Sequence, residues 1–234
     1  PPWQQALSEA FSDPADLLRY LELDTKTLPG VIHPAFGMRV PRGFADRMTK
    51  GDPRDPLLLQ VLPTTDELAR HPGFSLNPVG DLEAQSTPGL LHKYRGRALV
   101  IATGACAVNC RYCFRRHYPY DRGTASPRRW QGILDRLRAD ESIREVILSG
   151  GDPLMVSDAR LADWLDQLAR IPHLKRLRLH SRLPVVLPER ITPDLLELLS
   201  RSPLSGLMVI HANHPNELSA EVVAALAGLR HRGV

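Results

Sequence analysis

The chain carries three cysteines in the spacing Cys106-x3-Cys110-x2-Cys113. An odd number of cysteines within one short segment argues against a disulfide framework and favours a metal or redox site. Three thiolates on one loop can bind three irons of a [4Fe–4S] cluster and leave the fourth iron open. A protein that only transfers electrons normally supplies four cysteines, so this pattern predicts that a small molecule binds the open iron.

The residues alone leave two other interpretations of these cysteines open. With His117 they could form a zinc site of four ligands. They could also be inert buried thiols, but Arg111, Arg115 and Arg116 lie beside them, and neighbouring cations make thiols acidic and reactive. The sequence therefore predicts that the pKa of these thiols is lowered.

A second motif, Ser149-Gly150-Gly151-Asp152-Pro153, follows the next apolar segment. Glycines allow backbone carbonyl groups to approach a ligand ammonium closely. A strand also often ends in an ordinary turn of Gly, Asp and Pro, so this motif is weak by itself. Its position after the strand that follows the cysteine loop strengthens both motifs.

Both motifs follow predicted strands of an α/β fold. Apolar or alternating segments predict strands at 98–103, 145–150, 176–181 and 206–212, and amphipathic segments predict helices at 127–139, 158–170, 193–201 and 217–232. This alternation predicts parallel strands joined by right-handed crossovers, in an open doubly wound sheet or in a partial (β/α) barrel of about four units. In both folds the chemistry lies at the C-terminal ends of the strands, where His180-Ser181-Arg182 and His211-Ala212-Asn213-His214 also fall.

The first 92 residues differ in character. Short helical patterns at 14–23, 43–50 and 65–70 alternate with Pro and Gly breaks, so we expect a helical, loop-rich region over 1–92 and the α/β part over 93–234. The last helix ends in a glycine that would lead into another strand, and the preceding strand would otherwise leave an open apolar edge. We therefore expect this chain to be a C-terminally truncated piece of a longer protein.

The composition is that of an ordinary globular protein. Apolar residues make up 43% and charged residues 24% of the 234 residues, no stretch resembles a membrane span, and the N-terminus lacks a signal pattern, so we expect a cytoplasmic protein without a membrane partner. The basic residues are 26 arginines and 4 lysines, which suits phosphate and carboxylate ligands. Aromatic residues make up only 6%, which does not favour a nucleic-acid-binding module, and we expect no nucleic-acid partner.

The cysteine spacing, with Tyr112 before the last cysteine and the Gly-Gly-Asp segment after the next strand, resembles the radical S-adenosylmethionine (SAM) superfamily. In that family the open iron chelates the methionine part of SAM, and one electron from the [4Fe–4S] cluster yields a 5′-deoxyadenosyl radical that abstracts hydrogen. The resemblance implies that Tyr112 lies against the adenine, that the segment 149–152 meets the SAM amino group, and that a flavodoxin or ferredoxin supplies the electron. It also favours a (β/α) barrel of the radical SAM type.

A closer resemblance, to the lysine 2,3-aminomutases, covers nearly the whole chain. It rests on GLLHKYRGRALV (89–100), CAVNCRYCFRRHYPY (106–120), LSGGDPL (148–154), LRLHSRLPVVLPERIT (177–192) and HANHPNE (211–217). The segments RVPRGFADRM (39–48) and GDPRDPLLLQVL (51–62) resemble the branch that serves elongation factor P. That branch makes (R)-β-lysine from (S)-α-lysine, and a partner ligase attaches the product to a lysine of elongation factor P. The resemblance thus implies an isomerase whose substrate is lysine.

This resemblance also implies pyridoxal 5′-phosphate (PLP) as a cofactor. It places Lys93, Tyr94 and Arg97 at PLP and Arg115 at the substrate carboxylate. The residues that it places around SAM are Tyr112, Ser149, Gly150, Gly151, Asp152, His180, Ser181, Arg182, His211 and Asn213.

One departure from the family concerns the lysine that holds PLP as a Schiff base. In the family this lysine, and two aspartates that bind the substrate ε-ammonium, lie in a part that would follow Val234. None of Lys26, Lys50, Lys93 and Lys175 is suited to the role. We therefore expect this chain alone not to complete the reaction. Alternatives that stay open are a glutamate or arginine aminomutase, a radical SAM enzyme that does not use PLP, and a zinc or iron–sulfur module that binds RNA.

Overall fold

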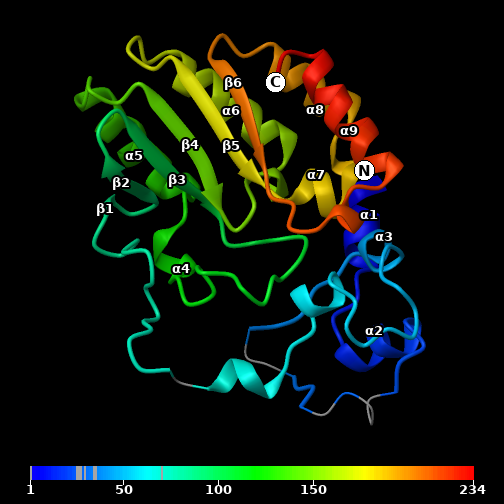
Figure 1. The fold of residues 1–234 in the computed structure, drawn as a ribbon. Coiled ribbons are helices and arrows are strands. Elements are labelled where there is room, and N and C mark those ends of the chain that lie inside the picture. The colour runs from blue at the N-terminus through cyan, green and yellow to red at the C-terminus, as the bar shows by residue number, and fades with distance from the viewer. Residues whose placement is uncertain (1, 25–27, 29, 34–35, 70) are drawn as a thin grey trace.

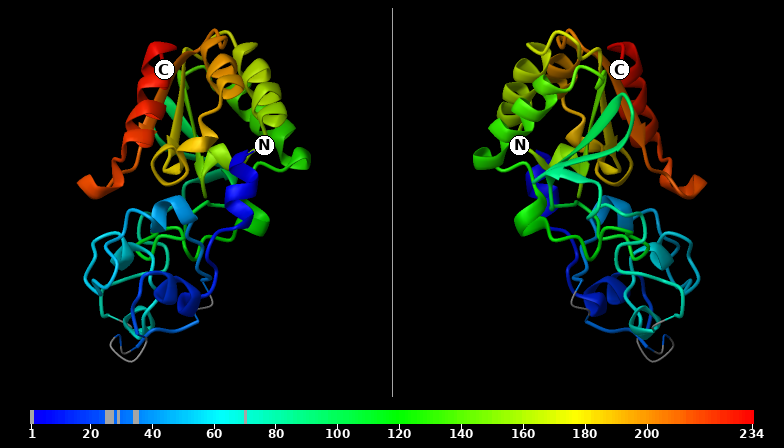
Figure 2. Two further views of the ribbon diagram at one scale, coloured as in Figure 1. Left: turned by 90° about the vertical axis from the view of Figure 1, so that its right-hand side faces the viewer. Right: turned by 90° about the vertical axis from the view of Figure 1, so that its left-hand side faces the viewer.

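The computed structural model describes residues 2–24, 28, 30–33, 36–69 and 71–234. Six strands of this described part form one sheet in the order β1-β2-β3-β4-β5-β6. Helices lie along the outside of the curved sheet, and the N-terminal region lies beyond the ends of the strands (Figures 1 and 2). No pairing joins β1 to β6 in the described residues, so the sheet is an open, partial barrel.

Four parallel strands form the centre of the sheet: β3 (Arg97–Thr103), β4 (Glu145–Gly150), β5 (Arg176–Ser181) and β6 (Ser205–Ile210). Every residue of β4 is buried, as expected for a strand covered on both faces. The prediction of an α/β fold with four strand–helix units is therefore confirmed.

An antiparallel hairpin of β1 (Gln85–Thr87) and β2 (Leu90–Tyr94) extends the sheet beyond β3, and the sequence patterns did not predict it. Only Leu90 and Leu91 of β2 are buried, so the hairpin lacks the apolar run that marks the central strands. Strand β2 crosses residue 92, where the character of the sequence changes.

The long helices agree with their predicted positions. They are α5 (Pro127–Ala139), α6 (Asp158–Ala169), α8 (Pro193–Ser200) and α9 (Ala220–His231). Trp130 of α5 stacks on Trp164 of α6 with ring centroids 4.6 Å apart, which fixes neighbouring helices to each other. Helix α9 begins three residues later than predicted, because Ser219 caps it and the short 3-10 helix η6 (Pro215–Glu217) precedes it. Two further short elements, α4 (Tyr120–Gly123) and η4 (Pro153–Met155), follow β3 and β4.

The N-terminal region contains shorter helices than the sequence patterns predicted. They are α1 (Pro2–Ser8), α2 (Pro14–Tyr20), α3 (Arg42–Ala45), η2 (Leu58–Gln60) and η3 (Thr65–Leu68); Arg70, the end of one predicted helix, lies outside the described residues. Leu17, Phe44 and Leu58 are fully buried and belong to the same apolar core as Leu148 of β4. The N-terminal region thus packs on the sheet at the end where the chemistry is expected.

Two short helices connect β5 to α8: α7 (Leu183–Val186) and η5 (Pro188–Arg190). None of the helices in the described part of the chain is long and apolar enough to cross a membrane.

Candidate active site

A cavity of about 350 Å³ lies at the C-terminal ends of β3 to β6. It brings together most of the residues that the sequence assigned to the cluster and to SAM. Those that line it are Cys106, Cys110, Tyr112, Cys113, Ser149, Gly150, Gly151, Asp152, His180, Arg182, His211 and Asn213, together with Arg115. Ser181 lies behind the wall: it is 1% exposed, and its hydroxyl donates to Asp152.

The cysteine loop follows β3 and is held by the N-terminal region. The backbone N–H of Asn109 donates to the carbonyl of Arg39, and that of Arg111 donates to the carbonyl of Gln60. The side chain of Arg111 forms a bidentate ion pair with Glu67 at 2.7 and 2.5 Å. Arg116 binds the same carboxylate at 2.7 Å. The loop is therefore fixed by two arginines that share one acid.

The prediction of acidic thiols is wrong for two of the three cysteines. Burial raises the pKa of the Cys106 thiol well above its usual value, and burial also raises the pKa of Cys113. The neighbouring arginines do not outweigh this effect of burial, and Glu67 and Asp81 offset part of their charge. A thiol in such a place ionises on binding a metal, which replaces the missing positive charge.

The three thiols fit a cluster better than a single ion. All three line one cavity, and the guanidinium of Arg182 donates to Cys110 Sγ over 2.7 Å. His117, the fourth ligand of the zinc interpretation, is exposed. Thiols spread around a cavity suit a group of several metal atoms.

The Gly-Gly-Asp segment packs directly against the cysteine loop. A Cβ at Gly151 would overlap the carbonyl oxygen of Ala105, and Gly150 has φ 120°, a conformation that favours glycine. The backbone N–H of Asp152 donates to Ala105 over 2.8 Å. The Gly-Gly-Asp segment and the cysteine loop therefore lie so close together that no side chain fits at Gly151.

Asp152 is fully buried among hydrogen-bond donors. Its carboxylate accepts hydrogen bonds from Ser181 Oγ and from the backbone N–H groups of Leu154, Arg182 and Leu183. Burial raises the pKa of Asp152 to about 6, and these hydrogen bonds oppose the rise. Asp152 thus joins the ends of β4 and β5 into one wall of the cavity.

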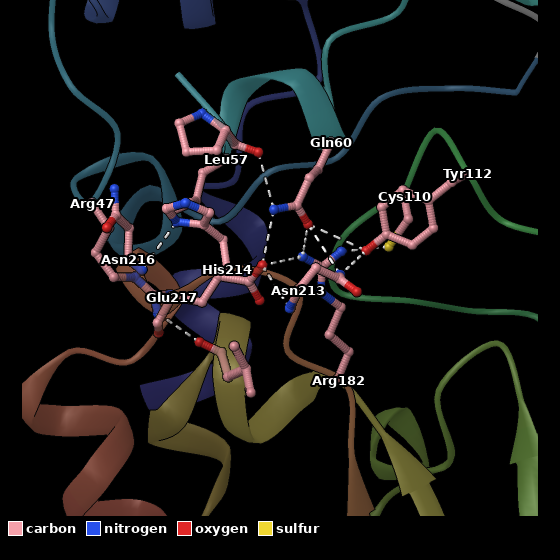
Figure 3. A network of polar contacts seen from close by, with 12 residues as sticks. Arg47, Leu57, Gln60, Cys110, Tyr112, Arg182, Asn213, His214, Asn216 and Glu217 are labelled. Carbon is pink, nitrogen blue, oxygen red and sulfur yellow. Dashed lines mark hydrogen bonds and ion pairs between the residues drawn. The ribbon is translucent and has the colours of Figure 1, made fainter. Parts of the chain in front are cut away.

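A polar network in Figure 3 links this wall to the N-terminal region through Gln60. Gln60 Oε1 accepts hydrogen bonds from Arg182 at 2.5 Å, Asn213 at 3.2 Å and Tyr112 at 3.3 Å. Three residues that the sequence assigned to SAM therefore converge on one amide. Sequence reasoning missed Gln60, although a lone polar residue inside the apolar run 57–62 could have drawn attention to it.

A second cavity of about 280 Å³ adjoins the first. Lys93, Tyr94 and Arg97, the residues assigned to PLP, line it at the hairpin side of the sheet. Four residues line both cavities: Leu99, Phe114, Arg115 and His180. The predicted SAM and PLP regions therefore meet at these side chains.

Asp81, which the sequence analysis also missed, lies at this junction. Asp81 is 2% exposed. Its Oδ1 lies 2.5 Å from Lys93 Nζ, and its Oδ2 lies 2.6 Å from Arg115 Nε. A lone aspartate in a loop carries no sequence pattern that could have singled it out.

His180 lies between the cavities as a neutral imidazole. Its ring centroid is 6.2 Å from that of His211, and no group in the described residues bonds to its buried Nε2. Burial, with smaller contributions from His211, Arg178 and Arg115, lowers the pKa of His180 to about 4. His180 thus lines both cavities, and its buried Nε2 has no hydrogen-bond partner among the described residues.

The chain is similar to known proteins along almost its entire length. Residues 100–228 match the model of the radical SAM superfamily. The chain is 50% identical to the L-lysine 2,3-aminomutase of Escherichia coli, over 99% of this chain and 68% of that protein. It is 48% identical to that of Haemophilus influenzae (92% and 64%) and 40% identical to that of Buchnera aphidicola (99% and 69%). The chain thus spans about two thirds of the length of these relatives.

Proposed function

Because this chain belongs to the lysine 2,3-aminomutase family of radical SAM enzymes, we propose that the whole protein converts (S)-α-lysine into (R)-β-lysine. The observation that carries this proposal is the junction of the two cavities at Leu99, Phe114, Arg115 and His180. A 1,2-amino shift requires the source of the radical and the cofactor that carries the amino group to lie side by side, and the junction provides that arrangement.

In this proposal Cys106, Cys110 and Cys113 hold a [4Fe–4S] cluster in the first cavity. The chemistry supplied by such a cluster, when SAM is bound, is one-electron cleavage of a carbon–sulfur bond to a radical that removes hydrogen. The chain's own residues shape the SAM site. The backbone N–H groups of Gly151 and Asp152 donate to carbonyls at the start of the cysteine loop, and Gln60 accepts hydrogen bonds from Tyr112 and Arg182.

The second cavity holds PLP in this proposal, with Lys93 and Arg97 as cations for its phosphate and Tyr94 at its ring. PLP supplies a π-system across which nitrogen can move between adjacent carbon atoms. Arg115 binds the substrate carboxylate, because its guanidinium reaches both cavities and is held by Asp81 and Ser149. His180 stays uncharged beside these cations and adds no further positive charge.

None of the lysines in the described residues is suited to hold PLP covalently. Lys50 binds Glu22 at the surface, and Lys175 binds the carbonyl of Pro172 just before β5, at the opposite end of the sheet. Lys93 binds Asp81. We therefore propose that the covalent lysine and the groups for the substrate ε-ammonium come from another part of the whole protein.

We further propose that the product serves elongation factor P and its lysyl ligase in the cytoplasm, with a flavodoxin or ferredoxin as the reductant. This proposal is supported by residues 39–48 and 51–62, which resemble the branch of the family that serves elongation factor P. Gln60, which binds Arg182 in the wall of the first cavity, lies in the second of these segments.

The test uses the full-length protein, reconstituted with iron and sulfide without oxygen and then reduced. We expect an EPR signal of a four-iron cluster that changes when SAM is added, and β-lysine when PLP and lysine are present. Cys110→Ala should lose the cluster signal. Conversion of glutamate or arginine instead of lysine would overturn the substrate, and bound zinc without a cluster would overturn the mechanism.

A further inference from the structure

Asp81 is the only acid, among the described residues, that forms ion pairs with Lys93 and Arg115. Lys93 lines the second cavity, and Arg115 lines both cavities. The side chain of Asp81 is 3% exposed. The backbone N–H of Asp81 donates to Asn77 Oδ1 over 2.9 Å, which fixes the turn that carries it. A buried carboxylate held between two cations constrains the position of both.

The ion pair with Asp81 determines which edge of Arg115 stays available. Nε donates to Asp81 at 2.6 Å and Nη1 donates to Ser149 Oγ at 3.2 Å, while the guanidinium lies 4.7 Å from the ring centroid of Phe114. Arginine carries five N–H donors in a planar fork. The donors that remain are on the two Nη atoms, so a carboxylate ligand must bind Arg115 end-on.

Lys93 is restricted in the same way. Its ammonium donates to the carbonyl of Val79 at 2.5 Å and lies 2.5 Å from Asp81 Oδ1. An ammonium has three N–H donors, and Val79 takes one of them, so the ammonium can still donate to a ligand in the second cavity. Val79 and Asp81 together set the position of the ammonium.

We propose that Asp81 is a positioning residue that orients the phosphate-binding Lys93 and the carboxylate-binding Arg115 together. This inference rests on the proposed function, which assigns those two anions to the two cavities. One carboxylate thereby fixes the distance between the cofactor and the substrate carboxylate, which decides whether the reacting carbon faces the radical source.

The direction in which Asp81→Asn changes anion binding distinguishes a positioning role from a purely electrostatic one. Loss of the negative charge of Asp81 would strengthen the binding of any anion nearby by Coulomb attraction alone. If instead Asp81 holds the two cations in place, Asp81→Asn weakens anion binding although the site becomes more positive. Asp81→Glu keeps the charge but moves the carboxylate by one methylene, so it should not restore binding.

The experiment measures two quantities in the full-length protein: equilibrium binding of PLP, by its absorbance, and the KM for lysine. We expect Asp81→Asn and Asp81→Glu each to weaken PLP binding and to raise the KM by about tenfold or more, which corresponds to a charged hydrogen bond. The control is Glu141→Gln, an exposed acid in the turn after α5 that lines neither cavity.

Glu141→Gln should change neither quantity, and the SAM-dependent EPR change should survive in all three variants, which shows that they fold. Unchanged or tighter PLP binding in Asp81→Asn would overturn the positioning role, as would full restoration by Asp81→Glu. If the wild-type protein itself binds no PLP, the proposed function fails instead, and the two failures are distinguished.

Discussion

The side-chain amide of Gln60 donates a hydrogen bond of 2.9 Å to Glu217 Oε1, across 157 residues of sequence. Because the amide nitrogen faces this acid, the amide oxygen must face Arg182, whose Nη2 donates to it at 2.5 Å. Glu217 is fully buried and also lies 3.3 Å from Arg182 Nη2. The pair therefore fixes the arginine that contacts Cys110 and connects the N-terminal region to the loop after β6 (Figure 3).

Gln60→Leu should lower the free energy of unfolding by about 2 kcal/mol, because buried partners of the amide lose their hydrogen bonds. The affected groups are Glu217, Arg182 and Asn213. Urea unfolding measures the change. Gln131→Leu, on the exposed face of α5, should stay within about 0.5 kcal/mol of the wild type. Equal stability of the two variants would contradict a structural role of the network.

Gly151→Ala should disturb the cysteine loop, because its Cβ would overlap the backbone of Ala105, next to Cys106. Overpacking of this kind costs about 1–3 kcal/mol. We expect a lower iron content after anaerobic reconstitution and lower stability. Gly132→Ala, in α5 with open space around it, should instead stabilise the protein by about 0.5–1 kcal/mol and keep the iron content. Normal iron binding by Gly151→Ala would show that the two loops can separate.

The central strands and the residues that follow them could be predicted from the sequence because both depend on local pattern and chain order. Runs such as 145–150 are apolar throughout, and parallel strands bring their C-terminal ends together whatever the loops do. Most candidate residues around SAM consequently line one cavity, as expected from their positions at strand ends. Their roles toward a ligand remain predictions.

Gln60 and Asp81 could not be predicted, because their partners lie far away in the sequence. Gln60 meets Arg182 across 122 residues, and Asp81 meets Arg115 across 34. The acidity of the thiols was predicted wrongly for the same reason. Arg111 and Arg116 lie near the cysteines in sequence, but the distant Glu67 binds both of them, so burial determines the pKa of Cys113.

Arg190→Met should lower the free energy of unfolding by about 3 kcal/mol, because two backbone carbonyl groups and one carboxylate lose the guanidinium that binds them. Arg190 is fully buried; it donates to the carbonyls of Leu154 and Val156 and pairs with Asp158 at 2.5 Å. Those carbonyls belong to the turn after Asp152. The exposed Arg128→Met in α5 serves as the control in urea unfolding. A loss no larger than that of the control would show that the turn holds without Arg190.

Acid should destabilise the protein partly through His180. The pKa of this imidazole is lowered from 6.5 to about 4, so its neutral form favours the folded state. The stability that this provides is fully present above pH 6.5 and is lost as the pH falls through about 4.

In His180→Gln the side chain does not titrate, so this part of the acid sensitivity should disappear. Between about pH 7.5 and about pH 5, the wild type should lose about 1 kcal/mol more unfolding free energy than His180→Gln, with allowance for solvent around the half-buried ring. Urea unfolding at the two pH values measures the difference. His231→Gln, at the exposed end of α9, should show the same pH dependence as the wild type. Equal acid sensitivity of His180→Gln and the wild type would mean that water reaches His180 in the folded protein and keeps its pKa near the unfolded value.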